Sequence, residues 1–368
     1  MRVPYSYLGE QFKDHRAILD EISELVKTGD FTLGKPVQQF EEEFARVVGA
    51  KYAIGVNSGT DALFLSLKAV RVGVGDEVIT APNTFIATVG AIVATGATPV
   101  FVDVKDDYTI DPALIKKAIT PKTKAIMPVH YAGHPADMPE IMAIAEDHGL
   151  AVVEDSCQAI TAAINNRYVG TFGIAGGFSL HPLKNLNVWG DGGVIVTNSG
   201  EIREKLILLR NHGLINRDEV QVFGYNSRLD SLQAVVGNHL IGDIGKTTET
   251  RIKWAGRIDA ALSDLKEYIR IPKREPGKRY VYHLYMVMVK DRDELLSHLI
   301  KNGIEAKVHY PIPLHLQPAA IHLGYKRGDF PVAEAQCESI ITLPVHQHLT
   351  EEEIDYSIEK IREFYLTK

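Results

Sequence analysis

Short apolar runs recur along the first half of the chain and predict the strands of a sheet. They are YAIGV, EVIT, TPVFVDV, KAIMPVH, AVVED, GGFSL and GVIVT, between about Lys51 and Thr197. Helical stretches with recognisable ends separate them, so the order of elements predicts an α/β domain around a mainly parallel sheet. One such helix is expected to start at the D-x-x-E pair of Asp137 and Glu140 and to stop at Gly149.

The pattern changes after Ser231, where a mostly helical stretch reaches about Lys266. We expect this stretch to connect two domains, because 368 residues exceed the size at which one core keeps growing. The second domain is a smaller α+β unit with a strand in YHLYMVMV, a helix over about 293–301, and a last helix starting at Thr350 with Glu353 as a capping box. The predicted boundaries are 1–240 for the large domain and 241–368 for the connector and small domain. The N-terminal segment is a candidate to pack on the small domain.

Composition and charge are those of an ordinary globular protein. Apolar residues make up 45% and charged residues 24%, and the formal charge of -7 is spread without long single-sign blocks. These features favour neither nucleic acid nor a membrane surface as a partner. Only Cys157 and Cys337 are present, and no run of about 18 apolar residues or apolar leader occurs. We therefore expect a cytoplasmic protein without a disulfide framework.

Two strand ends carry candidate chemistry. In NSGTDAL, Ser58, Gly59 and Thr60 open a helix directly after a strand. Free amides and the positive end of the helix dipole favour a phosphate there, although a simple helix cap would look the same. In AVVEDSCQA, Asp155 ends an apolar strand, where α/β folds place their ligands. A carboxylate that only caps the next loop is the alternative.

A third segment, GGFSLHPLKNLNVWGDGGVIVT, carries Lys184 ahead of a glycine-rich return over 190–193. Alone, such a lysine is usually a solvated surface residue. The three segments together match the needs of pyridoxal phosphate (PLP). This cofactor requires a helix N-terminus for its phosphate, an acid beside its pyridine nitrogen, and a lysine for its aldehyde. Thr60, Asp155 and Lys184 supply these parts in chain order, and the combination is more specific than any one of them.

The chain also resembles the DegT/DnrJ/EryC1/StrS sugar aminotransferases over nearly its whole length. The similar segments include FTLGKPVQQFEEEFA, GVNSGTDAL, GDEVITAPNTFIAT, VEDSCQA, FSLHPLKNLNVWGDGGVIVT, NSRLDSLQA and HYPIPLHLQPA. The resemblance implies the aspartate-aminotransferase-like fold type I of PLP-dependent transferases. That fold has a large, mixed, mainly parallel sheet domain and a smaller C-terminal α+β domain. It also implies a homodimer with shared active sites.

The resemblance assigns roles to individual residues. Lys184 and Asp155 would be catalytic, as the Schiff-base lysine and the partner of the pyridine nitrogen. Further cofactor contacts would come from Ser58, Gly59, Thr60, Phe85, Gln158, Ser179 and, from the neighbouring subunit, Asn226. Candidate substrate contacts are His181, Arg228, His309 and Tyr310.

Each of the substrate candidates has a simpler interpretation. His181 stands where relatives commonly have Tyr or Phe and could be a packing variant. Arg228 could form a surface ion pair. His309 and Tyr310 could merely order a loop. Cys157 departs from the usual family pattern, and we interpret it as a small buried side chain. His130 and His134 could suggest a metal pair, but they lack a third ligand in the sequence, so we predict no metal.

The implied reaction is a transamination. The amino group would pass from glutamate through the cofactor to a keto group of a nucleotide-linked sugar. Carbon 3 is favoured because HYPIPLHLQPAAIHLGYKRGDFPVAE looks more like members that aminate there. Alternatives are a 4-keto sugar or keto-cyclitol aminotransferase and a non-catalytic PLP-binding regulator. A dehydratase is disfavoured, because that branch replaces the lysine with histidine and Lys184 is present.

Overall fold

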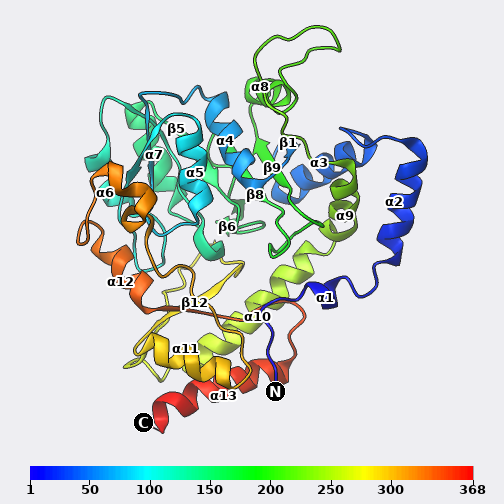
Figure 1. The fold of residues 1–368 in the computed structure, drawn as a ribbon. Helices are drawn as coiled ribbons and strands as arrows, with labels where there is room; N and C mark the ends of the chain where they lie inside the picture. Colours follow the sequence, from blue (N-terminus) through cyan, green and yellow to red (C-terminus); the bar gives the residue numbers. More distant parts are fainter. Residues whose placement is uncertain (368) are drawn as a thin grey trace.

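A seven-stranded sheet forms the centre of the large domain in the computed structural model, which describes residues 1–367 (Figure 1). Its spatial order is β1-β9-β8-β5-β4-β2-β3. The strands are β1 (Tyr52–Val56), β2 (Glu77–Thr80), β3 (Thr98–Phe101), β4 (Thr123–Ile126), β5 (Ala151–Asp155), β8 (Ala175–Ser179) and β9 (Gly193–Thr197). β8, β5, β4, β2 and β3 pair in parallel, whereas β9 runs antiparallel to both of its neighbours. The expected mixed, mainly parallel sheet is confirmed.

Strand register brings the important strand ends to one edge. Val56 at the end of β1 and Ser179 at the end of β8 both lie opposite Gly193, and Asp155 at the end of β5 lies opposite Gly177. Because these residues end their strands at the same edge, the segments that follow them converge there. This is the position at which open α/β sheets bind ligands.

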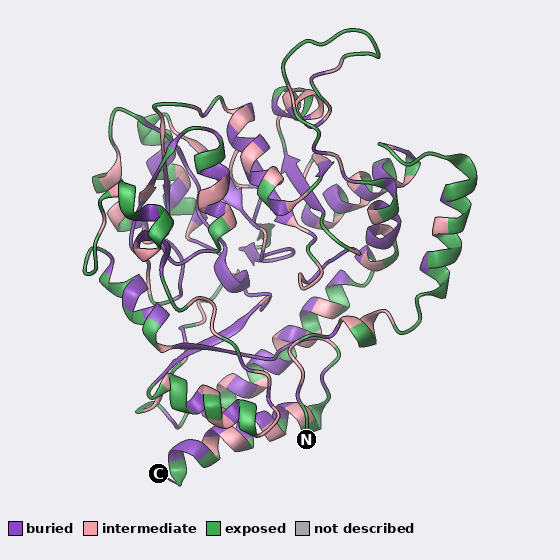
Figure 2. Cartoon of the chain, in the orientation of Figure 1, coloured by how far each residue is buried: buried purple, intermediate pink, exposed green. Residues whose placement is uncertain are grey.

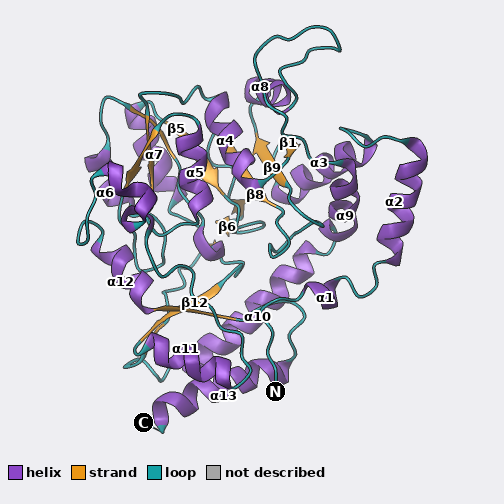
Figure 3. Cartoon of the chain, in the orientation of Figure 1, coloured by secondary structure: helices purple, strands orange, loops and turns teal. Residues whose placement is uncertain are grey.

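Helices cover both faces of the sheet (Figure 3). One core joins α2, α3 and α9 to Phe178, Val194 and Val196, and two others join α4 and α5 to the opposite face through residues such as Ile195 and Val153. The helices of this domain are α1 (Leu8–Gln11), α2 (Arg16–Thr28), α3 (Lys35–Val48), α4 (Gly59–Ala69), α5 (Ile86–Ala94), α6 (Pro112–Ala118), α7 (Met138–His148), α8 (Gly200–Arg210) and α9 (Ser231–Ile241), with a 3-10 turn at Tyr131–Gly133. The strands are buried between the two helical layers (Figure 2).

The C-terminal part begins with the long helix α10 (Ile244–Leu262) and contains a second sheet, ordered β10-β12-β13. Its elements are β10 (Ile269–Arg270), β12 (Tyr285–Val289), β13 (Ile340–Leu343), α11 (Arg292–Lys301), α12 (Pro331–Ser339) and α13 (Glu351–Leu366), with 3-10 turns at Leu314–Leu316 and Pro318–Leu323. A small sheet of β6 (Ala163–Ile164), β7 (Arg167–Tyr168) and β11 (Lys278–Arg279) joins the two parts. Val3 lies in the core of the C-terminal part and pairs with Ile304, so the N-terminal segment packs there.

Helix ends show where local sequence signals succeed and fail. Thr350 and Glu353 form the predicted capping box of α13, and Gly149 ends α7 in the left-handed conformation. α7 starts directly after Asp137, as expected, but the Asp137 side chain makes no cap hydrogen bond. Its carboxylate instead pairs with the ammonium groups of Lys105 and Lys278, which outcompete a backbone amide. Over residues 1–367, no helix is long and apolar enough to cross a membrane.

Candidate active site

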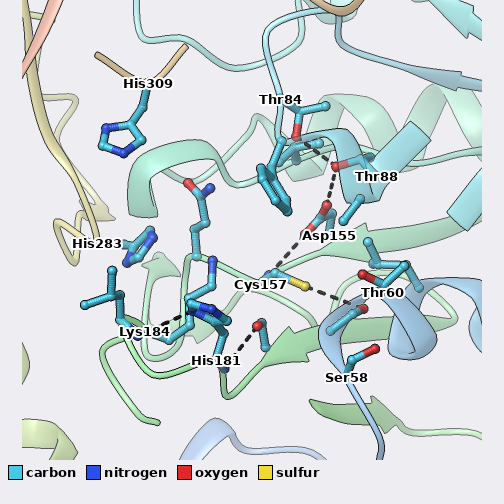
Figure 4. Close-up of a pocket in the computed structure, with 18 of the residues that line it drawn as sticks. Ser58, Thr60, Thr84, Thr88, Asp155, Cys157, His181, Lys184, His283 and His309 are labelled. Atoms are coloured by element: carbon cyan, nitrogen blue, oxygen red, sulfur yellow. Dashed lines mark hydrogen bonds between the residues drawn. The ribbon is translucent and has the colours of Figure 1, made fainter. Parts of the chain in front are cut away.

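A pocket of about 260 Å³ lies at the edge of the large sheet where β1, β5 and β8 end (Figure 4). It collects eleven of the thirteen residues that the sequence nominates: Ser58, Gly59, Thr60, Phe85, Asp155, Gln158, Ser179, His181, Lys184, His309 and Tyr310. Asn226 and Arg228 lie outside it. Residues from the N-terminus, the large domain and the C-terminal part therefore meet in one cavity.

The N-terminus of α4 forms one wall of the pocket. Ser58 caps the helix, since its Oγ accepts a hydrogen bond from the Asp61 amide at 3.1 Å. A Cβ on Gly59 would lie 2.6 Å from the Cβ of Ser179, so only glycine lets the helix start this close to β8. The remaining free amides and the dipole of this 11-residue helix create a positive potential. The wall is suited to an anionic group such as a phosphate.

A carboxylate is fixed at the base of the pocket. Asp155 is 5% exposed, and its Oδ2 accepts a hydrogen bond from Thr88 Oγ1 at 2.7 Å while its Oδ1 accepts one from the Cys157 amide at 3.1 Å. Because the Thr88 hydroxyl gives its proton to Asp155, the hydroxyl of Thr84, 2.8 Å away, must donate to Thr88. This chain of donors orients the carboxylate toward the pocket.

The amine of Lys184 enters the same pocket from the loop after β8. Burial lowers the pKa of Lys184 below its ordinary value, which favours the neutral amine that acts as nucleophile and base. The backbone carbonyl of Lys184 accepts hydrogen bonds from Tyr7 Oη at 2.8 Å and Asn187 Nδ2 at 3.0 Å. These bonds hold the loop, so the lysine side chain starts from a fixed position.

These groups fit PLP. The α4 N-terminus suits its phosphate, the Asp155 carboxylate suits its pyridine nitrogen, and the Lys184 amine suits its aldehyde.

Gln158 Oε1 accepts a hydrogen bond from the Ala132 amide at 2.6 Å, which leaves its amide NH2 as the group able to donate to a ligand. Phe85 is 46% exposed, so its ring is available for stacking. Cys157 is packed beside Gly59, and burial raises the pKa of its thiol well above the ordinary range, as expected for an unreactive side chain.

Three of the four substrate candidates, His181, His309 and Tyr310, also line the pocket (Figure 4). Burial lowers the pKa of His309 to about 4 and raises that of Tyr310 to about 12, so both side chains are neutral near pH 7. His309 Nδ1 lies 3.0 Å from the Thr342 hydroxyl. His181 also faces the pocket, beside the loop of Lys184. These side chains offer neutral hydrogen-bonding groups, which suit a sugar better than a charged ligand.

Sequence reasoning did not nominate eleven further lining residues, six of which have polar or titratable side chains: Tyr5, Thr84, Thr88, Cys157, Asp191 and His283. Thr88 lies three positions after Phe85, about one helical turn further along. This spacing places both residues on the same helix face, so the sequence could have nominated Thr88 as a pocket residue. Tyr5 and His283 come from distant segments, and their sequence surroundings carry no pocket signal.

Asn226 and Arg228 lie near the base of the loop over 211–227, which projects beyond α8 (Figure 1). Asn226 is exposed and pairs with Asn211, whose Oδ1 accepts a hydrogen bond from Arg228 Nη1 at 2.9 Å. Phe223 in the same loop is 98% exposed. The contribution of Asn226 to a neighbouring subunit's site stays a prediction.

The two histidines considered for a metal have other partners. His130 Nε2 lies 3.0 Å from Oε2 of the buried Glu154, and His134 Nδ1–H donates to the Asp107 carbonyl at 3.2 Å. No group of three His, Cys, Asp or Glu side chains that could hold a metal ion occurs in the described part of the chain.

The doubly covered mixed sheet and this pocket define an aspartate-aminotransferase-like PLP enzyme. Residues 13–362 match the DegT/DnrJ/EryC1/StrS aminotransferase family. The chain belongs to this family and is a PLP-dependent aminotransferase.

Individual relatives agree with this membership. The chain is 43% identical over 368 residues to a protein of Geobacillus stearothermophilus named pleiotropic regulatory protein, covering 99% of each. It is 43% identical over 338 residues to the UDP-N-acetyl-3-dehydro-alpha-D-glucosamine 3-aminotransferase of Acidithiobacillus ferrooxidans, covering 92% of this chain and 90% of that one. The crystal structure of S. venezuelae DesV in complex with a ketimine intermediate superposes with a TM-score of 0.96 at 40% identity, covering 99% of this chain and 98% of that one.

Proposed function

We propose that this enzyme transfers an amino group from L-glutamate to the 3-keto group of a nucleotide-linked sugar, as a cytoplasmic homodimer with shared active sites. The observation that carries the proposal is the meeting of the Lys184 amine, the Asp155 carboxylate and the α4 N-terminus in one pocket. Each group alone has a structural explanation, whereas their combination matches the three attachment points of PLP.

When bound, PLP supplies the electron sink for the carbanion that forms at the amino-bearing carbon. The protein side chains hold the cofactor and move the proton. Asp155 keeps the pyridine nitrogen protonated, and Thr88 holds the carboxylate in place for that task. Lys184 would hold the cofactor through its aldehyde, and its amine would move the proton at the donor carbon as a general base. Its lowered pKa leaves more of the amine neutral for this transfer.

Three features support a 3-keto sugar as the acceptor. The relative from Acidithiobacillus ferrooxidans is named for amination at carbon 3 of a nucleotide sugar. His309 and Tyr310 line the pocket and present neutral polar groups. Such groups can turn a sugar so that one carbonyl comes within bonding reach of the cofactor amine.

A non-catalytic regulator is the second candidate, favoured by the name of the Geobacillus stearothermophilus relative. A regulator needs the cofactor pocket but no proton carrier. The buried Lys184 amine, with its lowered pKa, is the feature that a catalyst requires and a regulator does not. We therefore favour the enzyme.

The subunit arrangement rests on the loop over 211–227. Its exposed apolar side chains, including Val220 at 51% and Phe223 at 98%, are costly in water and suit burial against a second copy. Asn226 and Arg228 follow at the base of this loop, where a partner's pocket could receive them.

The test is product analysis by mass spectrometry after incubation with glutamate and, separately, 3-keto and 4-keto nucleotide sugars. We expect amination mainly of the 3-keto compounds and none with Lys184→Ala. Efficient amination of only a 4-keto compound or a keto-cyclitol would move the assignment to that substrate. Cofactor binding without any transamination would favour the regulator.

A further inference from the structure

His283 lines the pocket on the wall opposite Asp155, and neither the family motifs nor the reaction as proposed uses it (Figure 4). It precedes β12, so it reaches the pocket from the C-terminal part of the chain. Its Nδ1 is sealed from solvent and has no hydrogen-bond partner among the described residues. The ring as a whole is only partly buried, so its other edge is the one available to the pocket.

His283 also lines a second, small cavity. Its volume is about 20 Å³, and His283, Arg251, His346, Tyr5 and Tyr7 are among the residues that line it. Each of the three residues has one sealed, unpartnered nitrogen within residues 1–367: His283 Nδ1, Arg251 Nη2 and His346 Nδ1. Three unpaired polar atoms around a space of this size are the usual setting of a buried water.

The donor and acceptor roles around such a water follow from the surrounding bonds. His346 Nε2 lies 3.0 Å from the Pro4 carbonyl and must donate to it, and burial lowers the pKa of His346 to about 4. His346 is therefore neutral, and its Nδ1 is an acceptor. Arg251 can only donate. A water that accepts from Arg251 Nη2 and donates to His346 Nδ1 has one proton and one lone pair left for His283 Nδ1.

The remaining proton of the water can be donated to His283 Nδ1. With Nδ1 as an acceptor, a neutral ring carries its proton on Nε2. The ring is neutral because burial, together with the charges of Lys184 and Arg251 and the nearby His309 and His181, lowers its pKa well below the ordinary value. Arg251 Nη1 also donates to the Tyr282 carbonyl at 3.1 Å and the His283 carbonyl at 3.4 Å, which holds the backbone on both sides.

We propose that His283 donates a hydrogen bond from Nε2 to an oxygen of the acceptor sugar, and that a water shared with Arg251 and His346 holds the ring in the required tautomer. The inference rests on the proposed function, since it needs a sugar acceptor. A neutral donor suits a carbonyl or hydroxyl oxygen, whereas a carboxylate of the amino donor would be better matched by a cation. His283 is therefore expected to contribute to the half-reaction with the sugar and not to the half-reaction with the amino donor.

The two half-reactions separate these possibilities. Rapid mixing follows the cofactor absorbance of the holoenzyme, first the aldehyde form with glutamate and then the amine form with a 3-keto nucleotide sugar. For His283→Phe and His283→Asn, kcat/KM in the sugar half-reaction should fall about tenfold more than in the glutamate half-reaction, mainly through KM. His283→Gln places an amide N–H near the position of Nε2 and should recover most of the loss. Thermal melting and cofactor absorbance of each variant control for folding.

Equal losses in both half-reactions, or a sugar half-reaction of His283→Phe equal to that of the wild type, would overturn the assignment of His283. If the wild type reacts with glutamate but with no keto sugar, the proposed function itself fails, and this inference fails with it. Nitrogen-15 NMR of histidine-labelled protein, with the His283 signal identified by its loss in His283→Phe, tests the tautomer separately. We expect a neutral ring protonated on Nε2 near pH 7, and protonation on Nδ1 would contradict the proposed donor role of Nε2.

Discussion

Replacing Thr88 by valine removes one hydroxyl from the base of the pocket while nearly preserving the shape of the side chain. Thr88 is 1% exposed, and its Oγ1 lies 2.7 Å from Asp155 Oδ2 and 2.8 Å from Thr84 Oγ1. The variant therefore leaves a buried carboxylate with one donor fewer and the Thr84 hydroxyl without its acceptor. A hydrogen bond to a charged group contributes about 1.5–3 kcal/mol. We expect the free energy of unfolding to fall by about 2 kcal/mol.

The same change should slow catalysis. Without Thr88, the Asp155 carboxylate can rotate away from the pyridine nitrogen that it is proposed to hold, so part of its electrostatic contribution is lost. We expect kcat of the glutamate half-reaction to fall about tenfold, since a tenfold change corresponds to about 1.4 kcal/mol. Urea unfolding of the cofactor-free chain and stopped-flow absorbance of the holoenzyme measure the two effects.

Thr88→Ser is the matched control, because it keeps the hydroxyl and removes only a methyl group. It should retain most of the wild-type rate. If Thr88→Val is destabilised but turns over like the wild type, Thr88 has a structural role only. If Thr88→Ser is as slow as Thr88→Val, the loss comes from packing and the reasoning about the hydroxyl is refuted.

Three further expectations concern the reaction, the subunits and pH. Asp155→Ala should lower turnover by about a hundredfold or more with a smaller effect on folding, since a positioned charge is lost; an unchanged glutamate half-reaction would refute its role. Mixing inactive Lys184→Ala and inactive Asn226→Ala chains should restore some activity if each site draws these groups from different subunits, and a fully active monomer in ultracentrifugation would rule this out. His134 is buried, and desolvation lowers its pKa from 6.5 to about 3. The folded chain therefore keeps it neutral while the unfolded chain takes up a proton, so stability present above pH 6.5 is lost as pH falls toward 3, by up to about 1.4 kcal/mol per pH unit. His134→Asn should flatten this dependence in urea titrations, and an unchanged slope would contradict the assignment.

The sequence predicted the strands well where apolar runs were short and bounded by turns. YAIGV, EVIT, AVVED and GVIVT form β1, β2, β5 and β9 with those limits. For the longer runs TPVFVDV and KAIMPVH, the predicted strands were too long. Their last residues lie in buried loops beyond the end of the sheet, and an apolar run indicates burial but not strand pairing. The helix start at Asp137 was predicted, but the pairing of its carboxylate with Lys105 and Lys278 was not, because these lysines lie in other parts of the sequence.

The site was predictable where it follows the sheet and less so where it depends on distant segments. Ser58, Asp155 and Ser179 lie at or just beyond the ends of strands. Their convergence follows from the parallel pair β5–β8 and from the antiparallel β9, which lies between β1 and β8 and makes these two strands run in the same direction. His283 and Tyr5 reach the pocket from the C-terminal part and the N-terminal segment. Their positions depend on how these parts pack on the large domain, which no local pattern encodes.

Borohydride reduction of the purified holoenzyme, followed by peptide mapping, tests the central claim most directly. Reduction fixes the cofactor to the amine that holds it. The account predicts the label on Lys184 within the FSLHPLKN segment, and Lys184→Ala should lose both the reducible link and transamination. A label on any other lysine, or transamination that survives in Lys184→Ala, would contradict it.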